Sequence, residues 1–145
     1  MVKAPNDDYT IYGKPAADIA KSLTAAWHPR VRALFDNMDE ADAAFWKITC
    51  SSPEGVPEWP NEPRVTLIGD AVHSMTPAGG NGANTAVRDS ALLGRLIAEA
   101  GGFGEGVTAA YEKEMRVYAS AAVKTSYAQA TGSFGARIDD STPTI

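Results

Sequence analysis

The feature that most constrains this chain is a glycine-rich segment between a short apolar run and a longer amphipathic one. The apolar run, residues 65–68 (VTLI), is rich in β-branched side chains, which predicts a strand buried on both faces. Gly69 and Asp70 follow it directly, and residues 79–84 (GGNGAN) open a segment with helical spacing that ends near residue 100. A strand, a loop and a helix in this order predict an α/β arrangement, with ligands at the carboxyl end of the strand.

The residue types in this segment suit a hydroxylated ligand that has an electron-rich edge. The Asp70 carboxylate can accept hydrogen bonds from ligand hydroxyls, and such charged acceptors bind more strongly than neutral ones. Gly69 lets the backbone turn close to a ligand. The glycines of residues 79–82 remove side-chain bulk where the first N–H groups of a helix point outward. The positive end of that helix favours an electron-rich or anionic group.

Helical spacing dominates the rest of the chain. It predicts further helices at residues 16–27, 29–38 and 107–130. The first two read as one helix that is broken at Pro29 and covers a core. Alternating side chains predict a half-buried strand over residues 45–50, and four prolines predict a loop over residues 52–63. Trp59 in this loop is expected to pack on apolar surface.

Composition and charge exclude several classes of function. The net charge is -5 and the basic residues are scattered, which argues against nucleic-acid binding. No apolar run approaches the ~18 residues that a membrane span needs. The single cysteine, Cys50, excludes an internal disulfide and fits a cytoplasmic location. We therefore expect a cytoplasmic protein that binds neither nucleic acid nor membrane.

Two other kinds of site have little support. Asp70 and His73 are spaced as metal ligands can be, but the chain has only two histidines and offers no third ligand at convincing spacing. Ser74 follows His73, yet the Gly-x-Ser-x-Gly turn that presents a nucleophilic serine is missing. We expect neither a metal site nor a hydrolytic nucleophile.

The order and spacing of the central residues resemble a known family. The run Gly69-Asp70-Ala71-x-His73, Pro77, Gly79-Gly80-x-Gly82-x-Asn84 is similar to the second FAD motif of FAD-dependent aromatic-ring monooxygenases, the para-hydroxybenzoate hydroxylase-like flavoproteins. Segments around Trp27, Phe45 and Tyr111 extend the resemblance over about residues 16–120.

The resemblance implies a cofactor and the residues that hold it. In the family, the aspartate matching Asp70 binds the ribityl chain of FAD, and the proline matching Pro77 lies against the isoalloxazine ring. The loop matching residues 79–84 places N–H groups along the pyrimidine edge of the flavin. The residues implied to contact FAD are Gly69, Asp70, Pro77, Gly79, Gly80, Asn81, Gly82, Ala83 and Asn84. Asp89 is expected to form a structural salt bridge or cap, and His73 to lie behind the flavin loop.

The family reaction uses NAD(P)H and O2 to hydroxylate an aromatic ring. Because the flavin carries the difficult chemistry, no side chain of this chain need act as an acid, a base or a nucleophile. The resemblance implies an aromatic small-molecule substrate and a role in the oxidative metabolism of an aromatic or polyketide-like compound.

The chain departs from the family in one large respect. The Gly-x-Gly-x-x-Gly turn that binds the ADP half of FAD is absent, and the glycines of residues 101–106 follow a helix rather than a strand. The sequence therefore predicts an incomplete α/β FAD-binding fold, mostly helical with a few short strands, whose affinity for FAD is weak. The expected organisation is a remnant of the substrate-binding domain and a connecting loop (1–60), the C-terminal part of the FAD-binding domain with the helix that follows (61–132), and a flexible tail (133–145).

Two further interpretations remain open. The chain could act as a non-redox interaction module, as a homo-oligomer or as the partner of a complementary flavoprotein chain. Its pocket could also have been adapted to a cyclase or isomerase reaction. Bound flavin would favour a monooxygenase, and its absence together with a defined oligomer would favour the interaction module.

Overall fold

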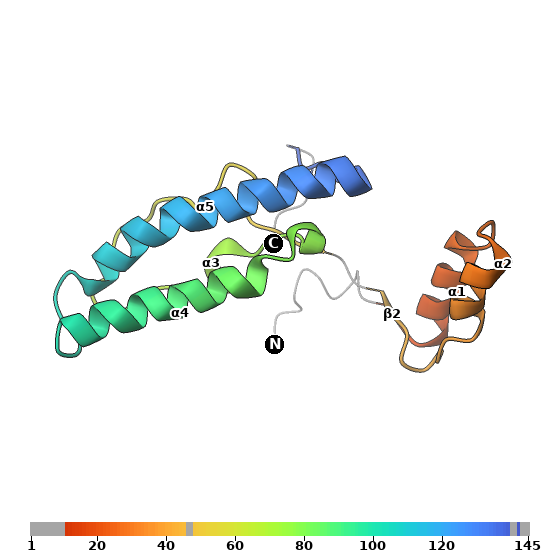
Figure 1. The fold of residues 1–145 in the computed structure, drawn as a ribbon, viewed down its shortest axis with the longest axis horizontal. Helices are drawn as coiled ribbons and strands as arrows, with labels where there is room; N and C mark the ends of the chain where they lie inside the picture. Colours follow the sequence, from red (N-terminus) through yellow and green to blue (C-terminus); the bar gives the residue numbers. More distant parts are fainter. Residues whose placement is uncertain (1–10, 46–47, 140–141, 143–145) are drawn as a thin grey trace. The chain divides into compact units, whose positions relative to one another are not determined.

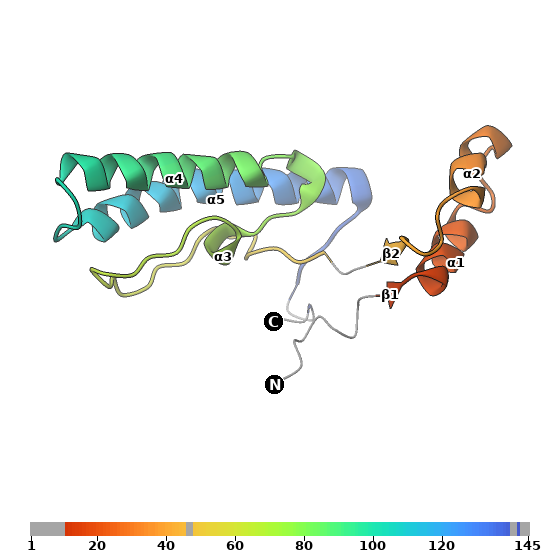
Figure 2. The same ribbon diagram turned by 90° about the horizontal axis from the view of Figure 1, so that it is seen from below.

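A computed structural model describes residues 11–45, 48–139 and 142. The chain divides into two compact units, one ahead of Thr49 and the other running from Thr49 to Thr142. Figures 1 and 2 show the elements of each unit. The predicted division at residue 60 concerns the family domain from which each segment comes, and it stays a prediction.

The first unit is built on two short helices and a minimal sheet. Its elements are β1 (Ile11–Tyr12), α1 (Lys14–Leu23), α2 (Pro29–Asp36) and β2 (Ala44–Phe45). The two strands pair antiparallel, with Ile11 opposite Phe45 and Tyr12 opposite Ala44. The buried core of this unit is three alanines, Ala16, Ala17 and Ala43, against which Ile11 and Met38 pack. So small a core buries little apolar area.

Both early helices are found, but α2 does not cover a core. It begins at Pro29, as predicted, because proline is favoured in the first turn of a helix. It contains no buried residue, and Val31 and Leu34 are 43% and 73% exposed. The predicted strand over residues 45–50 is wrong at its end: β2 stops at Phe45 and residues 48–50 have no regular structure. Trp46 and Lys47 lie outside the described residues.

A hairpin of two long helices forms the second unit. Its elements are α3 (Asp70–His73), the 3-10 turn η2 (Pro77–Gly79), α4 (Gly82–Glu99) and α5 (Val107–Phe134). Helices α4 and α5 lie side by side in both views (Figures 1 and 2). The predicted helices over 82–100 and 107–130 are thus confirmed. The turn at residues 101–106 joins two helices, as the sequence indicated.

The core of the second unit lies between α5, α4 and the long loop before α3. Apart from the adjacent pair Tyr111 and Glu112, residues buried on α5 recur every three or four positions, as the spacing of one helix face requires. The main buried cluster is Val56, Val72, Leu92, Tyr111, Met115 and Ala119. Trp59 packs against this cluster, as predicted, and the Arg116 guanidinium lies 4.1 Å from the centre of its ring.

The predicted buried strand at residues 65–68 does not form. Val65, Leu67 and Ile68 are 62%, 44% and 42% exposed, and only an isolated bridge links Val65 to Glu62. A strand needs a neighbour to pair with its N–H and C=O groups. Within the described residues the only sheet is β1–β2 of the first unit, so this segment has none.

Helix side chains hold this segment instead. The Thr66 hydroxyl donates to Glu112 (3.1 Å), and the Tyr111 hydroxyl donates to the carbonyl oxygen of Leu67 (3.1 Å). The fold is therefore mostly helical with a few short strands, which confirms that part of the prediction. The α/β class itself stays a prediction.

Candidate functional site

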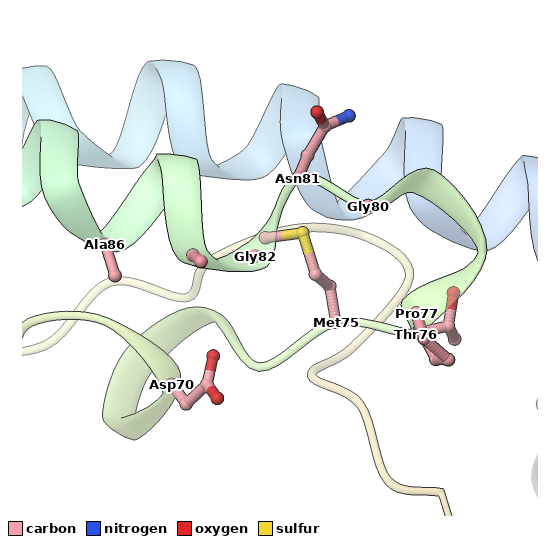
Figure 3. A pocket seen from close by; sticks show the side chains of 9 residues that line it. Asp70, Met75, Thr76, Pro77, Gly80, Asn81, Gly82 and Ala86 are labelled. Atoms are coloured by element: carbon pink, nitrogen blue, oxygen red, sulfur yellow. The ribbon is translucent and has the colours of Figure 1, made fainter.

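A pocket of about 330 Å³ lies where α3, the turn η2 and the start of α4 meet (Figure 3). Its lining residues are Asp70, Met75, Thr76, Pro77, Gly80, Asn81, Gly82, Ala83 and Ala86. All of them belong to the second unit. The volume falls at the lower end of the range for small-molecule sites, roughly 300–1,000 Å³.

The structure brings most of the residues implied by the resemblance into this one pocket. Six line it: Asp70, Pro77, Gly80, Asn81, Gly82 and Ala83. Three do not: Gly69, Gly79 and Asn84. The lining also includes Met75, Thr76 and Ala86, which sequence reasoning missed. Ala86 lies one helical turn beyond Gly82 and Ala83, so helical spacing could have found it. No sequence signal marked Met75.

Gly69 and Gly79 do not line the pocket, but each is needed for the backbone path of the residues that do. Gly69 is buried and precedes α3 with φ of 61°, a left-handed conformation that glycine adopts without strain. Asp70 is thereby the first residue of α3. A Cβ on Gly79 would lie 2.8 Å from Oε1 of Gln129 and 3.4 Å from Cα of Ser126, so this glycine lets the turn approach α5 closely.

The N-terminus of α4 supplies backbone donors beside the pocket. This helix of 18 residues begins at Gly82, and no side-chain hydrogen bond caps it within the described chain. The N–H groups of a first helical turn have no partner inside the helix, so they are available to a ligand. Figure 3 shows the Asn81 side chain turned away from Asp70, whereas the Met75 side chain extends toward Gly82.

The pocket loop is fastened to α5 through Thr76. The hydroxyls of Thr76 and Ser126 lie 2.7 Å apart, and the Ser126 hydroxyl also bonds the Thr76 carbonyl oxygen at 2.7 Å. Ser126 is fully buried. Paired buried polar groups of this kind fix one geometry, because breaking them would leave a desolvated donor or acceptor unsatisfied.

Asp89 forms the centre of a buried polar cluster next to the pocket. Its Oδ2 accepts from the backbone N–H of Gly69 (2.7 Å) and lies 2.6 Å from Nε2 of His73. Its Oδ1 accepts from the Tyr118 hydroxyl at 2.6 Å. Asp89 and His73 are both fully buried. The structural role predicted for Asp89 is confirmed, and the cluster joins α3, α4 and α5.

The environment of Tyr118 keeps its hydroxyl protonated. Burial raises the pKa of this phenol, and its hydrogen bond and proximity to the Asp89 carboxylate raise it further. The Arg88 guanidinium, 3.9 Å from the centre of the ring, acts in the opposite direction and is outweighed. Tyr118 is therefore a permanent donor to Asp89 at neutral pH.

One ring nitrogen of His73 is engaged by Asp89. Among the described residues, Nδ1 is buried and has no hydrogen-bond partner. Within the described segments, no group of three or more His, Cys, Asp or Glu side chains is arranged to hold a metal ion. No helix in the described part of the chain has the length and apolar character to cross a membrane.

Comparison with known proteins identifies the family. The sequence model described as "FAD binding domain" matches residues 17–126, well over half of the chain. A dual O-methyltransferase/FAD-dependent monooxygenase of Phaeosphaeria nodorum is 48% identical over 77 residues, which are 53% of this chain and 8% of that protein. These findings confirm the resemblance on which the sequence analysis rests.

Two further relatives are also monooxygenases by name. A 6-hydroxynicotinate 3-monooxygenase of Bordetella bronchiseptica is 36% identical over 81 residues, 56% of this chain and 20% of that protein. An FAD-dependent monooxygenase of Penicillium rubens is 36% identical over 97 residues, 65% of this chain and 18% of that protein. The chain thus matches no more than a fifth of the length of these relatives.

Proposed function

Because this chain belongs to the FAD-binding domain family of FAD-dependent monooxygenases, we propose that its pocket holds the flavin half of FAD. The observation that carries the proposal is the meeting of the Asp70 carboxylate with the uncapped start of α4 in one pocket. A flavin offers ribityl hydroxyls, which suit a carboxylate acceptor, and a ring edge that becomes negative on reduction. The positive end of a helix stabilises that charge.

The pocket passes a simple test of fit to this group. Its lining combines one carboxylate with small residues, Gly80, Gly82, Ala83 and Ala86, and the apolar side chains of Met75 and Pro77. A Cβ on Gly80 would meet no atom within 4 Å, so the loop leaves open space at that position. Asp70 would hold the ribityl chain, while the N–H groups at the start of α4 would face the ring edge. The bound flavin would supply the oxidation chemistry.

We propose that the reaction is hydroxylation of an aromatic or polyketide-like compound with NAD(P)H as reductant. The support is the family membership and the monooxygenase names of the relatives. The part of this chain is to bind and orient the flavin, so the proposal assigns no catalytic side chain to it.

Residues outside this chain would hold the ADP half of FAD. The chain has no Gly-x-Gly-x-x-Gly turn after a strand, and its glycines at 101–106 join two helices. The exposed apolar side chains of Val65, Leu67 and Ile68 support the contribution of another polypeptide segment, because uncovered apolar surface favours association.

Fluorescence titration with FMN tests the proposal. FMN keeps the ring and the ribityl chain and drops the half for which this chain has no site. The parent chain should bind FMN and FAD with similar, weak affinity. Asp70→Ala should weaken both about tenfold to a hundredfold, since a hydrogen bond to a charged group contributes roughly 1.5–3 kcal/mol.

Glu105→Ala is the matched control. Glu105 is an exposed carboxylate in the turn between α4 and α5, so its removal changes the net charge equally without touching the pocket. If Asp70→Ala and Glu105→Ala bind FMN alike, the pocket assignment is wrong. His73→Ala is unsuitable as a control, because His73 is buried against Asp89.

A further inference from the structure

We propose that Asp89 is a positioning residue, which holds the turn at Gly69 and thereby aims Asp70 into the flavin pocket. The inference rests on the proposed function, since Asp70 is the proposed acceptor for the flavin hydroxyls. Asp89 itself does not line the pocket. It acts through the backbone of the residue that precedes Asp70.

Both backbone polar groups of Gly69 are used. Its N–H donates to Oδ2 of Asp89 (2.7 Å), and its carbonyl oxygen accepts from the N–H groups of Val72 and His73, both at 3.0 Å. The left-handed conformation of Gly69 is therefore fixed on both sides. Asp70 follows directly, so the direction of its side chain depends on this turn.

Asp89 is itself held from two other helices. The His73 ring, at the end of α3, lies against the same Oδ2 that accepts from Gly69. The Tyr118 hydroxyl, on α5, donates to the other oxygen. A carboxylate with both oxygens engaged in a fully buried site cannot rotate without leaving several groups unpaired. The packing of the three helices thus sets the orientation of the Asp89 carboxylate, and this carboxylate in turn fixes the position of the Gly69 N–H.

The charge of Asp89 is less important than its acceptor geometry. In Asp89→Asn, the amide oxygen can accept from Gly69 and His73 while the amide nitrogen donates to the Tyr118 oxygen. Asp89→Ala leaves all three groups without an acceptor. Asp89→Glu keeps the charge but moves the oxygens by one methylene. The three variants separate geometry from charge.

The test uses the full chain and measures two quantities for each variant. One is the FMN dissociation constant, from fluorescence titration. The other is the amide exchange rate of Gly69 without flavin, followed by NMR. The control is Leu92→Ala, a buried apolar truncation on the same helix that removes packing but no hydrogen bond of the cluster.

Asp89→Ala should weaken FMN binding at least about tenfold and speed Gly69 exchange by a similar factor, both beyond the change in Leu92→Ala. Asp89→Asn should stay close to the parent in both quantities. Parent-like FMN binding in Asp89→Ala, or a loss no larger than in Leu92→Ala, would overturn the inference. So would an Asn variant that fails as badly as the Ala variant.

Two remaining outcomes are also decisive. If Asp89→Ala does not fold, tighter FMN binding by Asp89→Asn than by Asp89→Glu supports positioning by geometry, and the reverse order overturns it. If the parent binds no FMN, the proposed function fails, and Gly69 exchange alone decides whether Asp89 holds the turn. The inference is then supported if Gly69 exchanges at the parent rate in Asp89→Asn and faster than in the parent in Asp89→Glu. Any other result overturns it.

Discussion

The two units of this chain are stabilised in different ways. Among the described residues of the first, the polar contacts between side chains are ion pairs such as Lys14–Asp18, Arg32–Asp36 and Lys21–Glu40, and the core is a group of alanines. In the second, a fully buried carboxylate joins three helices next to the pocket. Surface ion pairs contribute little to stability, whereas a buried carboxylate that loses its partners costs several times more.

The buried hydrogen bonds occur in the unit whose pocket requires a defined direction of the Asp70 side chain. Asp70 has to point into a pocket, and the segment before it has no sheet to hold it. In place of a strand ladder, Asp89 accepts a hydrogen bond from Gly69, Glu112 accepts one from Thr66, and Tyr111 donates one to the Leu67 carbonyl oxygen. The first unit contributes no residue to the pocket.

The largest expected effect is a loss of stability confined to one of the two units. Met115→Ala removes a fully buried side chain from the second unit and should lower its free energy of unfolding by about 2–5 kcal/mol. Hydrogen exchange with mass spectrometry should show faster exchange in peptides of residues 82–134 and unchanged exchange in residues 11–45. The reference is Met38→Ala, which trims the small core of the first unit and should give the opposite pattern. Joint loss of protection in both units would show that they do not unfold independently.

An intermediate effect concerns the buried cluster and its dependence on pH. Tyr118→Phe leaves Oδ1 of Asp89 without its donor and should cost about 1–3 kcal/mol. The folded-state pKa of the Tyr118 phenol is raised above the value of 10.0 for a free phenol. Its contribution is therefore fully present below pH 10 and is lost as the pH rises from there toward the folded-state pKa.

Thermal melts between pH 8 and pH 11 check this prediction. The parent should lose stability more steeply above pH 10 than Tyr118→Phe does. Tyr12→Phe is the control, because Tyr12 lies in the first unit and its side chain is 68% exposed. Identical alkaline slopes in the parent and Tyr118→Phe would refute a role for this phenol.

The smallest effect is expected for the surface ion pairs of the first unit. The hydrogen bond from Lys21 lowers the pKa of Glu40, and the nearby charge of Lys14 adds to this. Any stabilisation from Glu40 is present above the ordinary pKa of 4.5 and lost as the pH falls through the lowered value. At neutral pH and physiological salt, Glu40→Gln should change exchange in residues 11–45 by less than about twofold, because exposed pairs are screened. A large loss of protection would show that the first unit, like the second, depends strongly on a single carboxylate.

Much of the fold and of the site followed from the sequence. Apolar residues at helical spacing predicted α4 and α5, and the break at Pro29 predicted the start of α2. The spacing of Asp70, Pro77, Gly80 and Gly82 predicted residues that the structure brings into one pocket. These features depend on neighbours within a few positions along the chain, so the sequence carries them directly.

The tertiary structure alone decided the rest. Residues 65–68 have the composition of a strand, but a strand exists only where a second one pairs with it, and composition does not provide the partner. The sequence likewise indicated a structural role for Asp89 without showing that it binds Gly69, His73 and Tyr118 together. Those partners lie 16 to 29 positions away, and only the packing of α3, α4 and α5 brings them within hydrogen-bonding distance of one carboxylate.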